Sequence, residues 1–227
     1  GDGTYRIPGH TIRDSHGGIG TVSVKRAFEE SSNVAIAKLI NAAYQNDQEK
    51  FPAHLYDWGL NKKLVLQIPG EGQPVIKNPN NRSWNKKQSL PQMAYGYEMQ
   101  ITPLQMLAFY NAVANDGRYI APIFVREIRR LGNTVEQFKA RVINEKIVSD
   151  ETIKKAQELL EAVVENGTGK GLASPLYKIA GKTGTAQVAD ANKGYRVDKK
   201  YQASFCGYFP ADNPKYSLIV VVNNPRK

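Results

Sequence analysis

Apolar residues in the first part of the chain recur with the three- and four-residue spacing of helices. Ser23 is placed to cap a helix that runs to about residue 30, and helical spacing resumes over 34–40. Between these stretches, Ser31-Ser32-Asn33 groups three side chains that compete with the backbone for hydrogen bonds. We therefore predict two helices, with a break or the start of the second helix at these polar residues.

The pattern becomes less regular over the next part of the chain. Helical spacing over 54–58 predicts a short helix that stops at Gly59. Proline, glycine and asparagine then recur through 67–92, which we predict to be a loop. Helical spacing returns after Thr102-Pro103, where a capping hydroxyl precedes a first-turn proline, and this helix is expected to close at 115–117.

From residue 118 the pattern changes to one typical of strands. Stretches 119–130 and 135–147 are predicted as strands around Gly132-Asn133, which is a hairpin signal. Ser149 is placed to cap a helix that ends at Gly167. Three further strands are expected at 177–187, 201–209 and 215–223.

These elements predict an α+β fold in which helices cover an antiparallel sheet beside a helical lobe. We expect one partial domain over 1–227, with the helical lobe at about 20–117 and the sheet lobe at about 118–227. The composition agrees, since 41% hydrophobic and 23% charged residues are typical of a globular protein. The longest aliphatic run, 218–222, is far too short to span a membrane.

Charge, cysteine and histidine content narrow the function classes. The formal net charge is +10, but the basic residues are scattered in pairs, and we expect no nucleic-acid partner. Cys206 is the one cysteine, so no internal disulfide can form, and a buried structural role is expected for it. The three histidines lack the spacing of metal ligands, so we expect neither a metal nor a cofactor.

The most informative polar stretch is Lys182-Thr183-Gly184-Thr185, within the predicted strand 177–187. A cation and two hydroxyls could hold a carboxylate, and glycine allows another chain to approach the backbone closely. Taken alone, the stretch is a weak signal and is more often an ordinary exposed strand end. A phosphate-binding loop is excluded, because Leu176 stands where such a loop needs glycine.

Ser31-x-Asn33 followed by Lys182-Thr183-Gly184 resembles the motif set of the penicillin-interacting serine transferases and hydrolases. Further stretches resemble the class B penicillin-binding proteins, particularly the division-associated peptidoglycan D,D-transpeptidases. These stretches are 9–14, 95–105 and 207–212. The resemblance covers nearly the whole chain in the right order and implies the serine β-lactamase and penicillin-binding-protein transpeptidase fold.

The resemblance implies an acyl transfer that cross-links peptidoglycan stem peptides in septal cell-wall synthesis and is blocked by β-lactams. Stem peptides and β-lactams are therefore the expected partners, with a glycosyltransferase and division proteins expected to join the full-length form. The expected location is the periplasmic face of the cell membrane, held by an N-terminal anchor absent from this chain. A non-enzymatic β-lactam sensor or a structural division module of the same fold is the open alternative.

The family's catalytic roles fall on Ser31, Asn33 and Lys182. The resemblance implies that Ser31 relays a proton toward the leaving group and that Asn33 holds the amide of the donor peptide. It further implies that Lys182 biases the site electrostatically toward the substrate carboxylate and the relay serine.

Substrate binding is expected along the strand itself. Thr183 and Thr185 share one face of a strand by its two-residue period, and the resemblance implies that they bind the terminal carboxylate. The backbone N–H of Thr185 is expected to contribute to the oxyanion hole. Gly184 is expected to leave room for the substrate to lie along the strand edge.

Two departures from the family pattern stand out. The nucleophilic Ser-x-x-Lys motif does not occur upstream of Ser31, and its one match, Ser83-Trp84-Asn85-Lys86, is interpreted as a chance match in a loop. We therefore expect the nucleophile in sequence preceding Gly1 and no activity from this chain alone. Glu98 stands where the family pattern has a second glycine, and this either alters the edge of the cleft or is a surface substitution.

Overall fold

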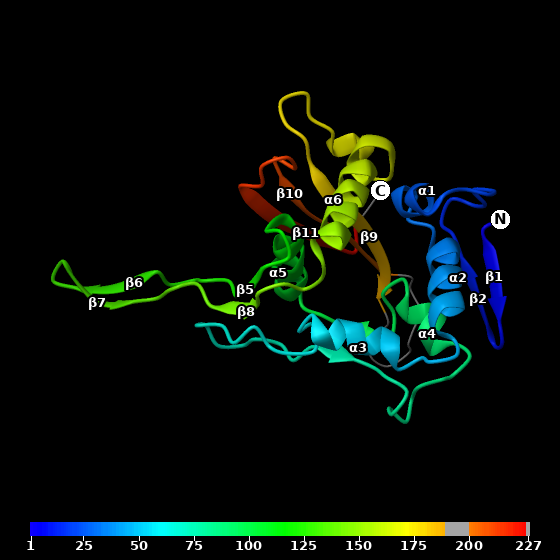
Figure 1. Cartoon of the computed structure of the whole chain (residues 1–227), viewed down its shortest axis with the longest axis horizontal. Coiled ribbons are helices and arrows are strands. Elements are labelled where there is room, and N and C mark those ends of the chain that lie inside the picture. Colours follow the sequence, from blue (N-terminus) through cyan, green and yellow to red (C-terminus); the bar gives the residue numbers. More distant parts are fainter. Residues whose placement is uncertain (189–199, 226–227) are drawn as a thin grey trace.

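The computed structural model describes residues 1–188 and 200–225 (Figure 1). The helices are α1 (Val24–Glu29), α2 (Asn33–Tyr44), α3 (Lys50–Asp57), α4 (Ser89–Met93), α5 (Pro103–Ala114), α6 (Asp150–Asn166) and the 3₁₀ turn η1 (Lys170–Leu172). The strands are β1 (Thr4–Ile7), β2 (His10–Arg13), β3 (Val75–Ile76), β4 (Met99–Gln100), β5 (Tyr119–Ile120), β6 (Glu127–Arg130), β7 (Asn133–Gln137), β8 (Val142–Asn144), β9 (Ala180–Val188), β10 (Lys200–Phe209) and β11 (Tyr216–Asn223).

The largest sheet has three antiparallel strands in the order β11-β10-β9. These are the three C-terminal strands predicted from the sequence, with the first beginning at Ala180 instead of residue 177. The central strand β10 pairs with β9 through Phe205 opposite Thr183 and with β11 through Phe205 opposite Val220. The strand order makes β9, which carries the Lys-Thr-Gly stretch, an edge strand of this sheet.

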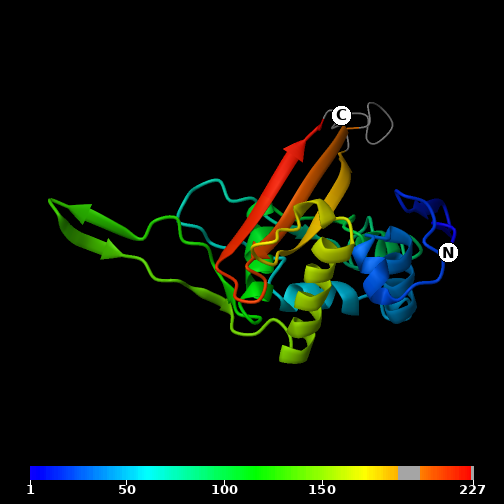
Figure 2. The ribbon, with the colours of Figure 1, turned by 90° about the horizontal axis from the view of Figure 1, so that it is seen from above.

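Two long helices pack against this sheet and share one core with it (Figure 2). Helix α5 contacts β10 and β11, while α6 contacts β9. Helix α6 contributes one apolar face to this core, whereas α5 is apolar over most of its surface. The buried members of the core include Ala108, Ala112, Val113, Ile153, Leu160, Ala180 and Tyr208. Cys206 is buried in the sheet, and burial raises the pKa of its thiol to about 12.

Three predicted helix starts are confirmed by their side-chain caps. The hydroxyls of Ser23, Thr102 and Ser149 each accept a backbone N–H at the beginning of α1, α5 and α6. At α5 the cap is reciprocal, since the Gln105 amide oxygen accepts the Thr102 N–H at 3.0 Å. These caps fix where the helices that frame the sheet begin.

The hairpin prediction around Gly132-Asn133 is correct in type but not in detail. The turn residues are Leu131 and Gly132, both with positive φ, and the long strands are divided into β6–β7 and β5–β8 pairs with register shifts. The β6–β7 hairpin projects away from the body of the molecule, and Leu131 at its tip is 95% exposed (Figures 1 and 2).

Several elements were not predicted from the sequence, among them the β1–β2 hairpin, strands β3 and β4, and helix α4. The β1–β2 hairpin turns at Pro8-Gly9 and packs Ile12 against α2. The predicted loop 67–92 contains strand β3 and the start of α4, whose Leu90 is fully buried. Pro91 does not prevent α4 because it lies in the first turn, where its absent N–H would have no helical partner. No helix in the described residues is long and apolar enough to cross a membrane.

Close backbone packing in the sheet yields a stability prediction. A Cβ at Gly207 would lie 2.3 Å from the Ala180 carbonyl oxygen and 3.0 Å from Gly181 Cα. We expect Gly207→Ala to lower the free energy of unfolding by about 2 kcal/mol, because backbone atoms cannot move aside cheaply. Urea denaturation measures this, with Gly171→Ala as the control because a Cβ there meets nothing within 4 Å. Equal destabilisation by both variants would contradict the packing argument.

Candidate active site

The chain between α1 and α2 is shaped to present Ser31. Helix α1 ends in a double hydrogen bond in which Ser31 N–H donates to Phe28 O and Ser32 N–H donates to Ala27 O. Such an ending requires a left-handed residue, and Ser31 has φ +53°. Glycine is the usual residue there, because a side chain costs about 1 kcal/mol or more in this conformation. The strained backbone turns the Ser31 hydroxyl toward the sheet, where it meets β9.

The two residues after Ser31 are fixed by the last residue of β2 and by the residue that follows it. The Ser32 hydroxyl caps α2 by accepting Ala35 N–H at 3.0 Å and donates to Asp14 Oδ2 at 2.9 Å. Asn33 donates its side-chain amide to the Arg13 carbonyl at 3.2 Å. The β1–β2 hairpin therefore orients the start of α2, including the Asn33 side chain.

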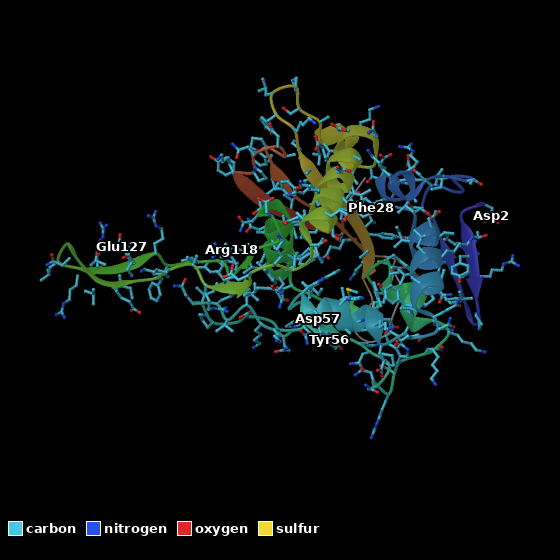
Figure 3. All side chains as sticks on the ribbon, viewed as in Figure 1. Asp2, Phe28, Tyr56, Asp57, Arg118 and Glu127 are labelled. Atoms are coloured by element: carbon cyan, nitrogen blue, oxygen red, sulfur yellow. The ribbon has the colours of Figure 1, made fainter. Side chains whose placement is uncertain are left out.

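Lys182 reaches from β9 to the end of α1. Its Nζ donates to Ser31 Oγ and to the Thr183 carbonyl, the latter at 3.3 Å. The ammonium also lies 5.6 Å from the centroid of the Phe28 ring, and Figure 3 labels Phe28 where α1 approaches the sheet. Burial lowers the pKa of Lys182 to about 8, since no carboxylate in the described residues forms an ion pair with it.

A third segment contributes a hydroxyl that the sequence reading did not select. Thr168, in the turn after α6, places its Oγ1 2.5 Å from Thr183 Oγ1 and 3.5 Å from Ser31 Oγ. Gly167 was predicted to end this helix, and it is the C-terminal cap residue of α6. In the cleft Thr168 contacts Ser31 and Thr183, which lie 137 and 15 positions from it along the sequence. No local sequence pattern could have predicted these contacts.

The rest of the Lys-Thr-Gly strand forms an open edge. β9 pairs with β10 on one side, and no other strand in the described parts of the chain pairs with its outer side. Thr185 is exposed on this strand. A Cβ at Gly184 would lie 2.7 Å from Ser204 Oγ on β10, so a larger residue at this position would require the Ser204 hydroxyl to rotate aside.

These residues line one cleft of about 930 Å³ between the helices and the sheet. All six residues expected to act in catalysis and binding lie in it: Ser31, Asn33, Lys182, Thr183, Gly184 and Thr185. Aromatic side chains that the sequence reading did not select complete the wall, among them Tyr95, Tyr97 and Tyr110. Within 1–188 and 200–225, no group of three histidine, cysteine or acidic side chains could hold a metal ion.

The whole chain, residues 1–227, matches the family described as penicillin binding protein transpeptidase domain. The chain belongs to this family. Penicillin-binding protein PbpB of Mycolicibacterium smegmatis is 30% identical, over 99% of this chain and 35% of that protein. The probable peptidoglycan D,D-transpeptidase PenA of Neisseria flavescens is 28% identical, over 97% of this chain and 50% of that protein.

Solved structures agree with the family assignment. The aztreonam complex of penicillin binding protein 3 from Mycobacterium tuberculosis superposes with a TM-score of 0.84 at 29% identity, over 98% of this chain and 50% of that one. The expected penicillin-binding-protein transpeptidase fold is thereby confirmed. This chain spans about a third to a half of the length of these relatives.

The two departures from the pattern of penicillin-binding proteins have clear structural settings. Ser83 lies exposed in a turn outside the cleft, which agrees with its interpretation as a loop residue. Glu98 has φ +62°, a left-handed conformation that favours glycine, and its carboxylate forms an ion pair with Lys77 at 2.6 Å. The ion pair links the segment between α4 and β4 to the residue that follows β3.

The left-handed backbone of Ser31 predicts a difference between two substitutions that both remove the hydroxyl. We expect Ser31→Gly to have a free energy of unfolding about 1 kcal/mol higher than Ser31→Ala, because glycine adopts φ +53° without strain. Thermal or urea unfolding of the two variants measures the difference. A less stable glycine variant would show that Ser31 is not strained in the folded protein.

The buried Lys182 ammonium predicts a titration near pH 8. We expect the Lys182 Cε resonance, followed by ¹³C NMR, to titrate near 8 while exposed lysines titrate near their ordinary pKa of 10.5. Between these values the unfolded chain binds more protons, so Lys182 makes the free energy of unfolding rise with pH across this window. Lys182→Met assigns the resonance and should remove that part of the pH dependence. A titration at 10.5 would contradict the burial argument.

Proposed function

We propose that this chain forms one wall of a serine-type peptidoglycan D,D-transpeptidase site, acting in septal cell-wall synthesis and inhibited by β-lactams. Membership of the transpeptidase family supports this proposal, as do relatives named peptidoglycan D,D-transpeptidase. The solved relative from Mycobacterium tuberculosis binds aztreonam and ampicillin. The activity belongs to the full-length protein, since the chain spans only part of each relative.

The observation that carries the proposal is the contact between Lys182 and Ser31 beside the open edge of β9. A buried cation that has no carboxylate partner among the residues that the structure describes attracts an anionic ligand group. An extended peptide can pair with the edge of β9 and bring its terminal carboxylate to that cation. The cleft thus fits a peptide that ends in a free carboxylate, which is the form of a stem-peptide donor.

The proposed roles follow from where the side chains lie. Thr183 and Thr185 bind the terminal carboxylate, with Lys182 supplying the favourable charge. Asn33, oriented by its bond to the Arg13 carbonyl, holds the donor amide. Ser31 passes a proton to the leaving D-alanine, and the Thr185 N–H donates to the oxyanion that forms during acylation.

The reaction consists of two acyl transfers. A serine hydroxyl attacks the penultimate D-alanine carbonyl, the ester forms, and the terminal D-alanine leaves with the proton that the serine loses. An amine of a second stem peptide then attacks the ester, and the serine recovers its proton. Ser31 lines the cleft but heads no Ser-x-x-Lys motif, and Ser83 heads one but lies outside the cleft. The attacking serine is therefore proposed to come from sequence outside this chain.

The proposed partners and location rest on the same assignment. Among the relatives is one named peptidoglycan D,D-transpeptidase FtsI homolog, of Mesostigma viride. We propose a division role for the full-length protein, with a glycosyltransferase and division proteins as its partners. Because the proposed substrates are stem peptides of the cell wall, we propose that the site lies on the periplasmic face of the cell membrane. An anchor for that location is proposed to lie in the full-length protein.

Labelling by a fluorescent penicillin tests the function. We expect the full-length protein to be labelled covalently and to transfer an acyl group from a stem-peptide analogue to an amine. Lys182→Met should lower the acylation rate by at least about a hundredfold, because a preorganised charge beside the reacting groups is removed. Lys178→Met is the matched control, since Lys178 is an exposed lysine paired with Glu161 outside the cleft.

The outcomes separate the alternatives. Labelling without transfer would support a β-lactam sensor, and the absence of labelling would support a structural division module. The chain of residues 1–227 alone should keep its mass after penicillin treatment, because its cleft lacks the attacking serine. An adduct on Ser31 or Ser83 of that chain would overturn this assignment of the nucleophile.

A further inference from the structure

The turn that follows α6 is fastened to the end of α1, directly before Ser31. Thr168 N–H donates to the Glu29 carbonyl at 3.1 Å, and Arg26 Nη1 donates to the Asn166 carbonyl at 2.9 Å. A Cβ at Gly167 would lie 2.3 Å from Glu29 O, so only glycine permits this approach. The backbone of Thr168 is therefore held in a fixed place relative to Ser31.

From that place the Thr168 side chain joins two other segments. Its Oγ1 lies 2.5 Å from Thr183 Oγ1 on β9 and 3.5 Å from Ser31 Oγ at the end of α1. Ser31 Oγ in turn accepts from the Lys182 ammonium. One ammonium and three hydroxyls thus form a continuous series across the cleft, and Thr168 is the link between its two ends.

The ammonium fixes the direction of the first hydrogen bond of this series, whereas either hydroxyl can donate in the other two. An ammonium can only donate, so Ser31 Oγ accepts from Lys182 and has its own proton to give. A hydroxyl that accepts one bond and donates the next polarises its neighbour in the same sense. If Thr168 accepts from Ser31 and donates to Thr183, the Thr183 proton is the one left to point at a ligand.

We propose that Thr168 is a positioning residue for carboxylate recognition. It accepts a hydrogen bond from Ser31, which itself accepts from Lys182, and donates one to Thr183. The proposal rests on the transpeptidase function above and adds a residue that acts only through Thr183. Thr168 makes the Thr183 hydroxyl a donor toward the cleft, so it strengthens binding of an anionic group more than of a neutral one. The exposed Thr168 side chain contributes little to the core.

The test compares a penicillin with its neutral methyl ester in the full-length protein. With the free carboxylate, we expect Thr168→Val to lower the second-order acylation rate about tenfold, since one hydrogen bond to a charged group is weakened. With the ester the loss should be less than about twofold. Thr168→Ser, which keeps the hydroxyl, should restore the rate to within about threefold of the wild type.

Two further variants separate positioning from a general structural effect. In a Thr183→Val background, Thr168→Val should lower the rate by less than about twofold, because the residue through which it acts is gone. Thr152→Val is the matched control: its Oγ1 lies 2.9 Å from Ser149 Oγ at the opposite end of α6, away from the cleft. It should leave both rates unchanged.

The results distinguish this inference from the function beneath it. A wild-type protein that no penicillin acylates would overturn both. Normal wild-type acylation, with equal losses for acid and ester or with additive losses in the double variant, would overturn the role of Thr168 alone. If Thr168→Val melts at a lower temperature than the wild type, Thr168→Ala replaces it, and the ratio of the acid and ester rates remains the deciding quantity.

Discussion

The arrangement of the cleft depends on a buried ammonium that is satisfied, within residues 1–188 and 200–225, without a carboxylate. Lys182 meets this requirement with a hydroxyl from the end of α1, a backbone carbonyl of its own strand and the face of the Phe28 ring. These groups come from α1 and from β9, so satisfying the charge also holds α1 against the sheet. The need to satisfy the charge of Lys182 therefore also sets how far apart the end of α1 and β9 lie across the cleft.

Local signals in the sequence predicted much of the framework. The caps at Ser23, Thr102 and Ser149 and the three C-terminal strands depend on neighbouring residues, and they were found. The β1–β2 hairpin and α4 were missed because burial against distant segments, not local pattern, stabilises them. The resemblance to a family selected residues that the structure gathers into one cleft. Thr168 was predicted neither by local sequence signals nor by the resemblance, because its place in the cleft results from contacts with residues distant in the sequence.

Two glycines of the sheet hold β9, the strand that lines the cleft, close to β10. Gly181 and Gly207 face each other across β9 and β10, where the Phe205 ring and the opposing backbone leave no space for a Cβ. This close packing holds β9 firmly against its partner while its outer edge stays open. A strand that is fixed on one side and open on the other can accept an extended peptide without first paying a large ordering entropy.

The projecting β6–β7 hairpin and the turn at Gly167-Thr168 differ in how they would tolerate changes in chain length. The hairpin extends away from the body, so inserted residues would lengthen it without moving the cleft (Figure 1). An added residue within α6 would rotate its end by about 100° and advance it by about 1.5 Å, removing the fit of Gly167 against Glu29. Among homologous chains, length variation should therefore gather in the hairpin and be absent from the end of α6.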